Sequence, residues 1–245
     1  YCRGKDGRCI NYYRKTGNIM KAIYAKYGIE LSLAENQIIT VVIENPQVLS
    51  DMLRDIFRQI NGEEGGWILS ENEKIFSLEK ATTLIDNPLR ADCNEKKILT
   101  KLYKELAEQA NSLLYEECSH LNSNIVTFLE NLLTTVPYHL EMEVGLDVAA
   151  LLKLYGVKVE TDGVEVLETL IDYLRAVSSI CNIHVVWMLN LKQFLTEEEV
   201  GQLYEFCFYE KIHLINLEGQ KSYTLEQEKC VIIDKDLCVI DTSLN

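Results

Sequence analysis

The sequence predicts an α/β fold, in which a mostly parallel sheet forms a head and an α-helical leg is inserted into it. Three observations support this class. Residues 40–43 form a β-branched run, typical of a strand buried on both faces, and helically spaced apolar residues follow after Pro46. Residues 95–136 carry apolar residues in steps of three and four. Strand-like and helix-like segments alternate from residue 146 onward, which favours right-handed crossovers between parallel strands.

The segment before the leg is predicted to be rich in β-strands. The expected strands cover residues 23–26, 29–33, 38–44, 67–69, 74–78 and 82–85. One helix follows the third strand, and Pro46 suits its first position because the proline ring presets φ. In many α/β proteins this corner carries a glycine-rich loop that holds phosphate at the helix N-terminus. Here it reads Glu44-Asn45-Pro46-Gln47, with a carboxylate and no glycine, so we ask what replaces the phosphate.

The leg is predicted to be a helical hairpin. Its two halves span residues 95–118 and 121–136, and both carry strong helix formers on their polar faces. The apolar stripe is narrow, like the seam of a coiled coil, so we expect the leg to project from the head as an arm.

The segment after the leg is predicted to alternate. The expected elements are a helix over 148–155, a strand over 157–160, a helix over 164–179, a strand over 184–189, a helix over 197–209, a strand over 213–217 and a hairpin closing at 234–236. Two capping boxes support the long helices, Asp162 with Glu165 and Thr196 with Glu199.

Charge is the most informative bulk property of the 245-residue chain, whose formal net charge is −14. Residues 1–29 hold seven of the 24 basic residues and one of the 38 acidic ones, which leaves 17 basic against 37 acidic, a net of −20. Nucleic acid is repelled by such a body unless the basic residues gather on one surface. We expect residues 1–19 to be a disordered or non-native leader before Met20.

The expected location is the cytoplasm, without membrane contact. The longest apolar run, residues 185–189, is far too short to span a bilayer. The eight cysteines include no Cys-x-x-Cys pair, which indicates reduced, mostly buried thiols.

No catalytic constellation emerges from the residues, so we expect a protein that is not an enzyme. A P-loop needs Gly-x-x-x-x-Gly-Lys-Ser/Thr, and the only Gly-Lys pair, Gly4-Lys5, lies in the leader and precedes an aspartate. There is no Gly-x-Ser-x-Gly turn, the four histidines are isolated in sequence, and Glu95-x-Lys97 lacks the strand context of a metal nuclease.

Two sets of charged residues remain as candidate binding sites. Glu141, Glu143 and Asp147 offer three carboxylates beside the return of the leg, and such hard oxygen ligands suit calcium. A basic minority lies around the crossover helices and strand ends: Lys153, Lys158, Lys192, Lys211 and Lys221. On numbers alone, an ordinary solvated surface is the simpler interpretation of both sets.

Four segments together resemble a known family. They are VVIENPQVLSDML, LLKLYGVKVETDGVEVLETLIDYLR, HVVWMLNLKQFLTEEEVGQLYEF and HLINLE. In this order they resemble the small adaptation (spacer acquisition) protein of type II-A CRISPR systems, a family of DNA-end-binding rings, over about residues 20–240. The resemblance implies a head like a degenerate P-loop ATPase core that has lost nucleotide binding. It also implies a non-enzymatic homotetramer whose positively charged hole threads the ends of double-stranded DNA. Calcium near the junction of leg and head, the CRISPR integrase complex and the effector nuclease are the implied cofactor and partners.

The resemblance also suggests site residues. Lys153 and Lys158 fall where family members have lysines, and with Lys192 and Lys221 they form the expected DNA-binding set. The metal set is Glu141, Glu143 and Asp147, in a stretch that Met142, Val144 and Gly145 interrupt, unlike the family's acidic run. After HLINLE the family often has Pro-Arg-Arg or Pro-Arg-Lys, whereas Gly219-Gln220-Lys221 leaves one cation here. The expected division is a leader over 1–19, a head over 20–93 and 138–245, and a leg over 94–137.

Two other functions stay open at this point. One is a degenerate nucleotide-binding regulator that holds a ligand at the carboxyl ends of the strands. The other is a helical interaction module whose arm binds a protein partner and no DNA.

Overall fold

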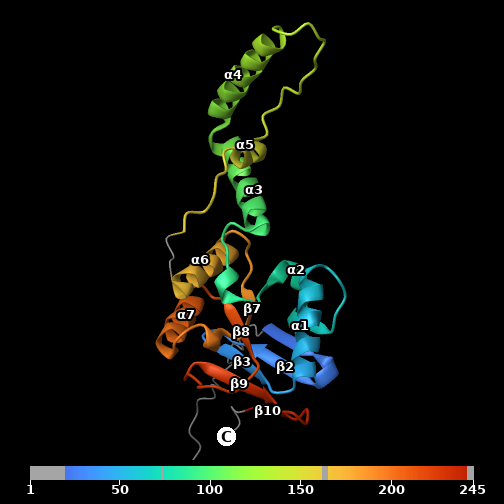
Figure 1. Cartoon of the computed structure of the whole chain (residues 1–245), viewed down its shortest axis with the longest axis vertical. Helices are drawn as coiled ribbons and strands as arrows, with labels where there is room; N and C mark the ends of the chain where they lie inside the picture. Colours follow the sequence, from blue (N-terminus) through green and yellow to red (C-terminus); the bar gives the residue numbers. More distant parts are fainter. Residues whose placement is uncertain (1–19, 73, 162–164, 242–245) are drawn as a thin grey trace, which may run out of the picture.

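The computed structural model describes residues 20–72, 74–161 and 165–241. Within these residues, a head of two sheets, four α-helices and three short 3-10 helices carries a long helical arm (Figure 1). The expected leader over residues 1–19 lies outside the described residues, as does Asp162 of the expected first capping box.

The main sheet is six-stranded, with the order β10-β9-β3-β8-β7-β6. Its strands are β3 (Ile38–Ile43), β6 (Thr82–Ile85), β7 (Val185–Leu189), β8 (His213–Glu218), β9 (Glu228–Ile233) and β10 (Val239–Asp241). Neighbours from β9 to β6 pair in parallel, and β10 pairs antiparallel with β9. The prediction of a mostly parallel sheet is confirmed, and every residue of β3, the strand predicted to be buried on both faces, is buried.

A second, antiparallel sheet has the order β2-β1-β4-β5. Its strands are β1 (Met20–Tyr24), β2 (Ile29–Leu33), β4 (Trp67–Glu71) and β5 (Lys74–Phe76). The strand predicted over 23–26 ends early because η1 (Ala25–Tyr27) turns the chain and Gly28 takes a left-handed φ of 65°. The strand predicted over 74–78 stops at Phe76, and α2 (Leu78–Ala81) begins instead.

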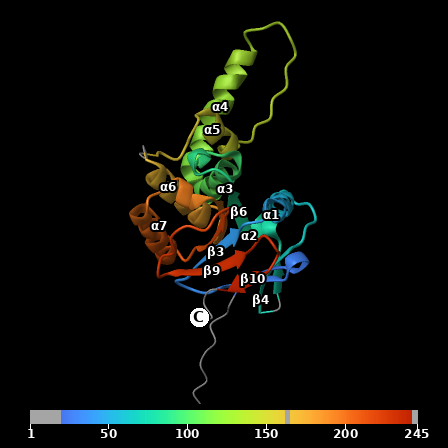
Figure 2. The same cartoon turned by 60° about the horizontal axis from the view of Figure 1, so that its bottom comes forward.

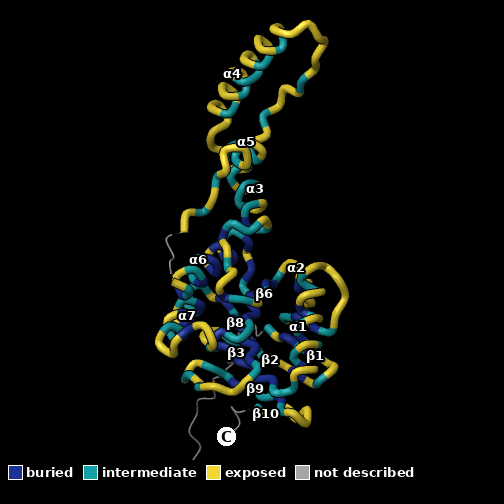
Figure 3. The backbone as a smooth tube through the Cα atoms, viewed as in Figure 1, coloured by how far each residue is buried: buried dark blue, intermediate teal, exposed yellow. Residues whose placement is uncertain are grey.

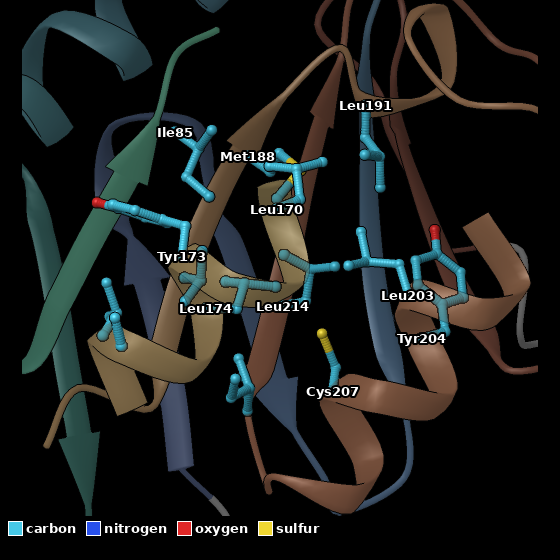
Figure 4. Packing of buried hydrophobic residues seen from close by; sticks show 14 of the residues in the cluster. Ile85, Leu170, Tyr173, Leu174, Met188, Leu191, Leu203, Tyr204, Cys207 and Leu214 are labelled. Carbon is cyan, nitrogen blue, oxygen red and sulfur yellow. The ribbon is translucent and has the colours of Figure 1, made fainter. Parts of the chain in front are cut away.

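Both faces of the main sheet are covered, one by the second sheet with one helix and the other by two helices. The second sheet and α1 (Pro46–Ile60) enclose one core, in which the rings of Trp67 and Trp187 meet edge to face with centroids 4.6 Å apart. On the other face lie α6 (Val166–Ser179) and α7 (Glu197–Tyr209). Figure 4 shows their side chains packed against the sheet: Leu170, Tyr173 and Leu174 from α6, Leu203, Tyr204 and Cys207 from α7, and Met188 and Leu214 from the strands. The short helices η2 (Pro88–Arg90) and η3 (Leu191–Gln193) complete the head.

The arm consists of α3 (Lys96–Leu113), α4 (Tyr115–Leu133) and the returning chain. Leu114 breaks the helix with a φ of −121°, but α4 then continues away from the head (Figure 1). The predicted hairpin is therefore wrong, since no glycine or proline near this break reverses the chain. Instead α5 (Val148–Leu154) packs on α3 after the chain returns over residues 134–147, first through turns and then without regular structure. The arm thus reaches beyond residue 137, where the prediction ended the leg.

The strand predicted over 157–160 does not form. This segment is extended but joins neither sheet, because side chains from the base of the arm take its backbone groups. Figure 3 shows that burial is concentrated in the head and that most of the arm is exposed or half-buried. Within the described residues, no helix combines the length and hydropathy needed to cross a membrane.

Candidate nucleic-acid interface

At the corner between β3 and α1, the side chain of Asn45 caps the N-terminus of the helix. Oδ1 of Asn45 accepts hydrogen bonds from the backbone N–H groups of Gln47 (3.0 Å) and Val48 (3.4 Å). Pro46 has no N–H, and the N–H of Leu49 bonds to the carbonyl of Asn45. The donors that would hold a phosphate at this helix N-terminus are thus already used. This is what replaces the phosphate loop.

A buried ion pair closes the carboxyl end of β8 nearby. The side chain of Lys192, in η3, is 2% exposed, and its Nζ donates to Oε2 of Glu228 (2.7 Å) and to the carbonyl of Tyr223 (2.7 Å). An ammonium group so enclosed is already neutralised and cannot reach a phosphate. The prediction that Lys192 binds DNA is therefore wrong: this lysine fastens the loop after β8 to the sheet.

The ion pair belongs to a larger polar network between the sheet and α7. The hydroxyl of Tyr204 donates to Oε1 of Glu228 (2.7 Å), and Nδ2 of Asn216 donates to Tyr204 (2.7 Å). Glu218 accepts from the backbone N–H of Lys192 (3.2 Å); burial raises the pKa of this carboxyl, and Lys192 opposes the rise. Lys192, Glu218 and Lys221 help to line a small hollow here, which the surrounding side chains almost completely fill. A nucleotide has no room there.

Lys158 is held between two anchors at the base of the arm. The carbonyl of Val157 accepts from the hydroxyl of Tyr103 (2.6 Å). The backbone of Val159 pairs with the side-chain amide of Asn94, accepting from Nδ2 (3.1 Å) and donating to Oδ1 (2.9 Å). With both neighbours fixed, the exposed side chain of Lys158 projects from a defined backbone position.

The other expected DNA-binding lysines are exposed but come from different parts of the chain. Lys153 lies in the last turn of α5, a few residues before Lys158 on the same returning segment. Lys221 lies on the head, in the loop that Lys192 fastens. These lysines were predicted from the sequence, but Asn94 and Tyr103 were not. Their partners lie more than fifty positions away, so no local sequence signal indicates them.

The three expected metal ligands lie along the returning chain of the arm. Glu141 and Glu143 are exposed, and Oδ1 of Asp147 caps α5 by accepting from the N–H of Ala150 (3.0 Å). Among the residues that the structure describes, no three His, Cys, Asp or Glu side chains stand close enough to hold a metal ion. A single chain in this conformation therefore does not assemble the set, and calcium binding stays a prediction.

Comparison with known proteins places the chain in a family. A family model described as CRISPR-associated protein (Cas_Csn2) matches residues 59–237, which are 179 of the 245 residues. The chain belongs to this family. The predicted resemblance to the type II-A CRISPR adaptation family is thus confirmed, and the protein is CRISPR-associated.

A curated relative and several solved structures are also similar. The CRISPR-associated protein Csn2 of Streptococcus agalactiae is 24% identical over 209 residues, covering 83% of this chain and 90% of the relative. An ATP-binding cassette of an ABC transporter in its ADP conformation aligns with a TM-score of 0.46 at 12% identity, over 89% of this chain and 87% of that chain. A nucleotide-free ATP-binding cassette aligns with a TM-score of 0.40 at 11% identity, over 87% of each chain.

Proposed function

We propose that this member of the Csn2 family is a non-enzymatic protein that binds the ends of double-stranded DNA as a homotetrameric ring during CRISPR spacer acquisition. The CRISPR integrase complex and the effector nuclease would be its protein partners. The observation that carries the proposal is the anchored position of Lys158. Two tethers to the base of the arm hold this exposed cation in place, and Lys153 precedes it on the same segment. A lysine so placed suits contact with the phosphate backbone, which carries no sequence information.

The surface of the arm supports assembly with further copies. No residue of the 19-residue α4 is buried, and its Phe128 and Leu132 are 63% and 50% exposed. Leu121, Phe128 and Leu132 recur at helical spacing, so they share one face. Helices in water derive most of their stability from packing such a face, and a second copy of the arm would supply the packing.

The absence of catalysis in this proposal is supported by the self-capped corner of α1 and by the filled carboxyl end of β8. The backbone N–H groups at the corner are already paired and side chains fill the hollow beside β8, so neither place suits a nucleotide. The nucleotide-regulator alternative therefore has little support, whereas the protein-interaction module shares the exposed arm with the proposal.

The decisive experiment compares binding of linear and closed circular duplex DNA of the same sequence, at low salt and with calcium. Binding of the linear form alone supports end threading through a ring. Equal binding of both forms contradicts threading, and binding of neither favours the protein-interaction module. Light scattering on the same sample measures the mass, which a Phe128→Asp, Leu132→Asp variant should lower towards that of the monomer. Glu130→Gln, on the same helix, is the matched control.

The role of Lys158 has its own test. If Lys158 pairs with one phosphate, Lys158→Ala should reduce the slope of log affinity against log salt by about one unit per contact. Lys21→Ala removes an equal charge from a surface pair with Glu30 and should leave the slope unchanged. An unchanged slope for Lys158→Ala would remove this lysine from the DNA path.

We propose that calcium binds only to the assembled ring, and not to a single chain. If assembly brings Glu141, Glu143 and Asp147 together, calcium should raise the melting temperature and the mass of the wild type. It should do neither for a Glu141→Gln, Glu143→Gln variant. If calcium changes the melting temperature and mass of both proteins equally, it does not bind at these carboxylates.

A further inference from the structure

A cleft of about 860 Å³ lies where the arm meets the head. Four elements line it: the C-terminal end of α1 with Asn61, α2 with Glu79 and Lys80, α3 with Lys97 and Lys101, and the turn after α6 with Asn182. None of these residues belongs to the expected DNA-binding or metal sets. Figure 1 places α2 and the segment that follows α5 on opposite sides of the base of α3, and in Figure 2 that segment again runs past α6, away from α2.

The charge of this cleft is opposite to that of the protein. Lys80, Lys97 and Lys101 face one carboxylate, Glu79, so the lining has an excess of two positive charges in a chain of net charge −14. A concave surface lined by one sign of charge concentrates the field between its walls. In the described part of the chain, none of the three lysines forms an ion pair, whereas Lys21, Lys26, Lys104, Lys192 and Lys229 do.

Neutral oxygens hold two of these ammonium groups in place. Nζ of Lys101 donates to the carbonyl of Cys181 (2.8 Å), and Nζ of Lys97 donates to the carbonyl of Glu79 (3.4 Å). A carbonyl oxygen orients an ammonium group without cancelling its charge. Both lysines lie close enough to affect the thiol of Cys181. Burial raises the pKa of this thiol, and the charges of Lys101 and Lys97 oppose the rise.

We propose that this cleft is a second anion site, which binds a phosphate-bearing ligand through Lys80, Lys97 and Lys101. Lysine is a point-charge donor suited to phosphate oxygens, and each ammonium group keeps donor capacity beyond its carbonyl contact. Lys97 and Lys101 stand one turn apart on α3, and Lys80 approaches from α2, so phosphate oxygens between them meet donors from two helices. Asn61 and Asn182 line the same cleft with neutral residues.

The phosphate has two possible sources, a free polyphosphate or nucleotide and the backbone of a nucleic acid. The test uses the full chain at low salt with two probes, inorganic tripolyphosphate and a short linear DNA duplex, and measures affinity by calorimetry. The cleft variant is Lys97→Ala, Lys101→Ala. The matched control, Lys21→Ala, Lys104→Ala, removes two charges from exposed lysines outside the cleft. Lys97→Arg, Lys101→Arg keeps the charge, and circular dichroism checks that each variant is folded.

We expect the wild type, the control and the arginine variant to bind tripolyphosphate. The affinity of the cleft variant should be lower by a factor of about ten or more. If the cleft variant also binds the duplex more weakly than the control does, the ligand is a nucleic-acid backbone. If it binds the duplex like the control, the ligand is a free anion. Either result supports the site. A wild type that does not bind tripolyphosphate, or a cleft variant that binds it like the wild type, overturns the inference. This outcome is independent of DNA-end binding through Lys158.

Discussion

The side-chain amide of Asn94 pairs with the backbone of Val159, 65 positions further on, through both its oxygen and its nitrogen. The two hydrogen bonds imitate the pairing of one strand residue with another. They hold a segment that lies in neither sheet, beside the lysine on which the proposed DNA contact depends. The first prediction concerns this pair.

Asn94→Ala should release the segment around Lys158. It removes two partly buried hydrogen bonds, so the free energy of unfolding should fall by about 1–2 kcal/mol. DNA binding at low salt should weaken, but less than with Lys158→Ala, because the charge remains. Asn122→Ala is the control, since it removes a bond to the carbonyl of Val144 on the same returning chain, away from the lysines. DNA affinity equal to that of the wild type would show that the tether does not position Lys158.

Lys192 should matter for stability and not for DNA. Lys192→Met leaves the carboxylate of Glu228 buried without its cation, so urea denaturation should show a loss of about 3–5 kcal/mol. Lys221→Ala, on the exposed loop above it, should change stability by about 0.5 kcal/mol or less. If the folded Lys192→Met protein has a reduced salt slope for DNA, our assignment of Lys192 to the structural network is wrong.

Asn45 should behave as a helix cap. Asn45→Ala should destabilise the head by about 1 kcal/mol, and Asn45→Asp by less, because aspartate also accepts from the helix N–H groups. Thermal unfolding measures both. ATP should not raise the melting temperature of the wild type, and a rise would return the nucleotide-binding alternative to consideration.

His213 should make stability depend on pH. Burial lowers the pKa of its ring in the folded protein, and His184 adds to this effect, while Glu35 and Glu71 oppose it. The unfolded chain therefore takes up the proton first, near the ordinary pKa of 6.5, and stability falls as the pH drops below that value. Urea midpoints between about pH 8 and pH 5 should fall less for His213→Gln. His120→Gln, on the exposed face of α4, is the control and should show the same pH dependence of the urea midpoint as the wild type. The same dependence for His213→Gln would contradict the prediction.

The elements that the sequence predicted well are those with local signals. Pro46 marks the start of α1, and the capping box of Thr196 and Glu199 opens α7 as predicted. The run of residues 40–43 identified a buried strand because a strand covered on both faces lacks the alternation of polar and apolar residues.

The failures came from long-range contacts. Val157 to Glu160 alternates like a strand, but the side chains of Asn94 and Tyr103, far away in the sequence, take backbone groups that a neighbouring strand would otherwise pair with. Lys192 resembles any surface lysine in sequence, and only the fold brings Glu228 to it from 36 positions away. The basic cleft combines residues from four separate elements and was not predicted at all.

The self-capped corner of α1 has a consequence for the energetics of the head. A fold that closes around a bound anion gains stability in proportion to the logarithm of ligand concentration, and it loosens when the ligand is scarce. Asn45 is covalently part of the chain, so its effective concentration at the helix end never varies. The stability of this corner therefore does not depend on the concentration of any free anion in the cell.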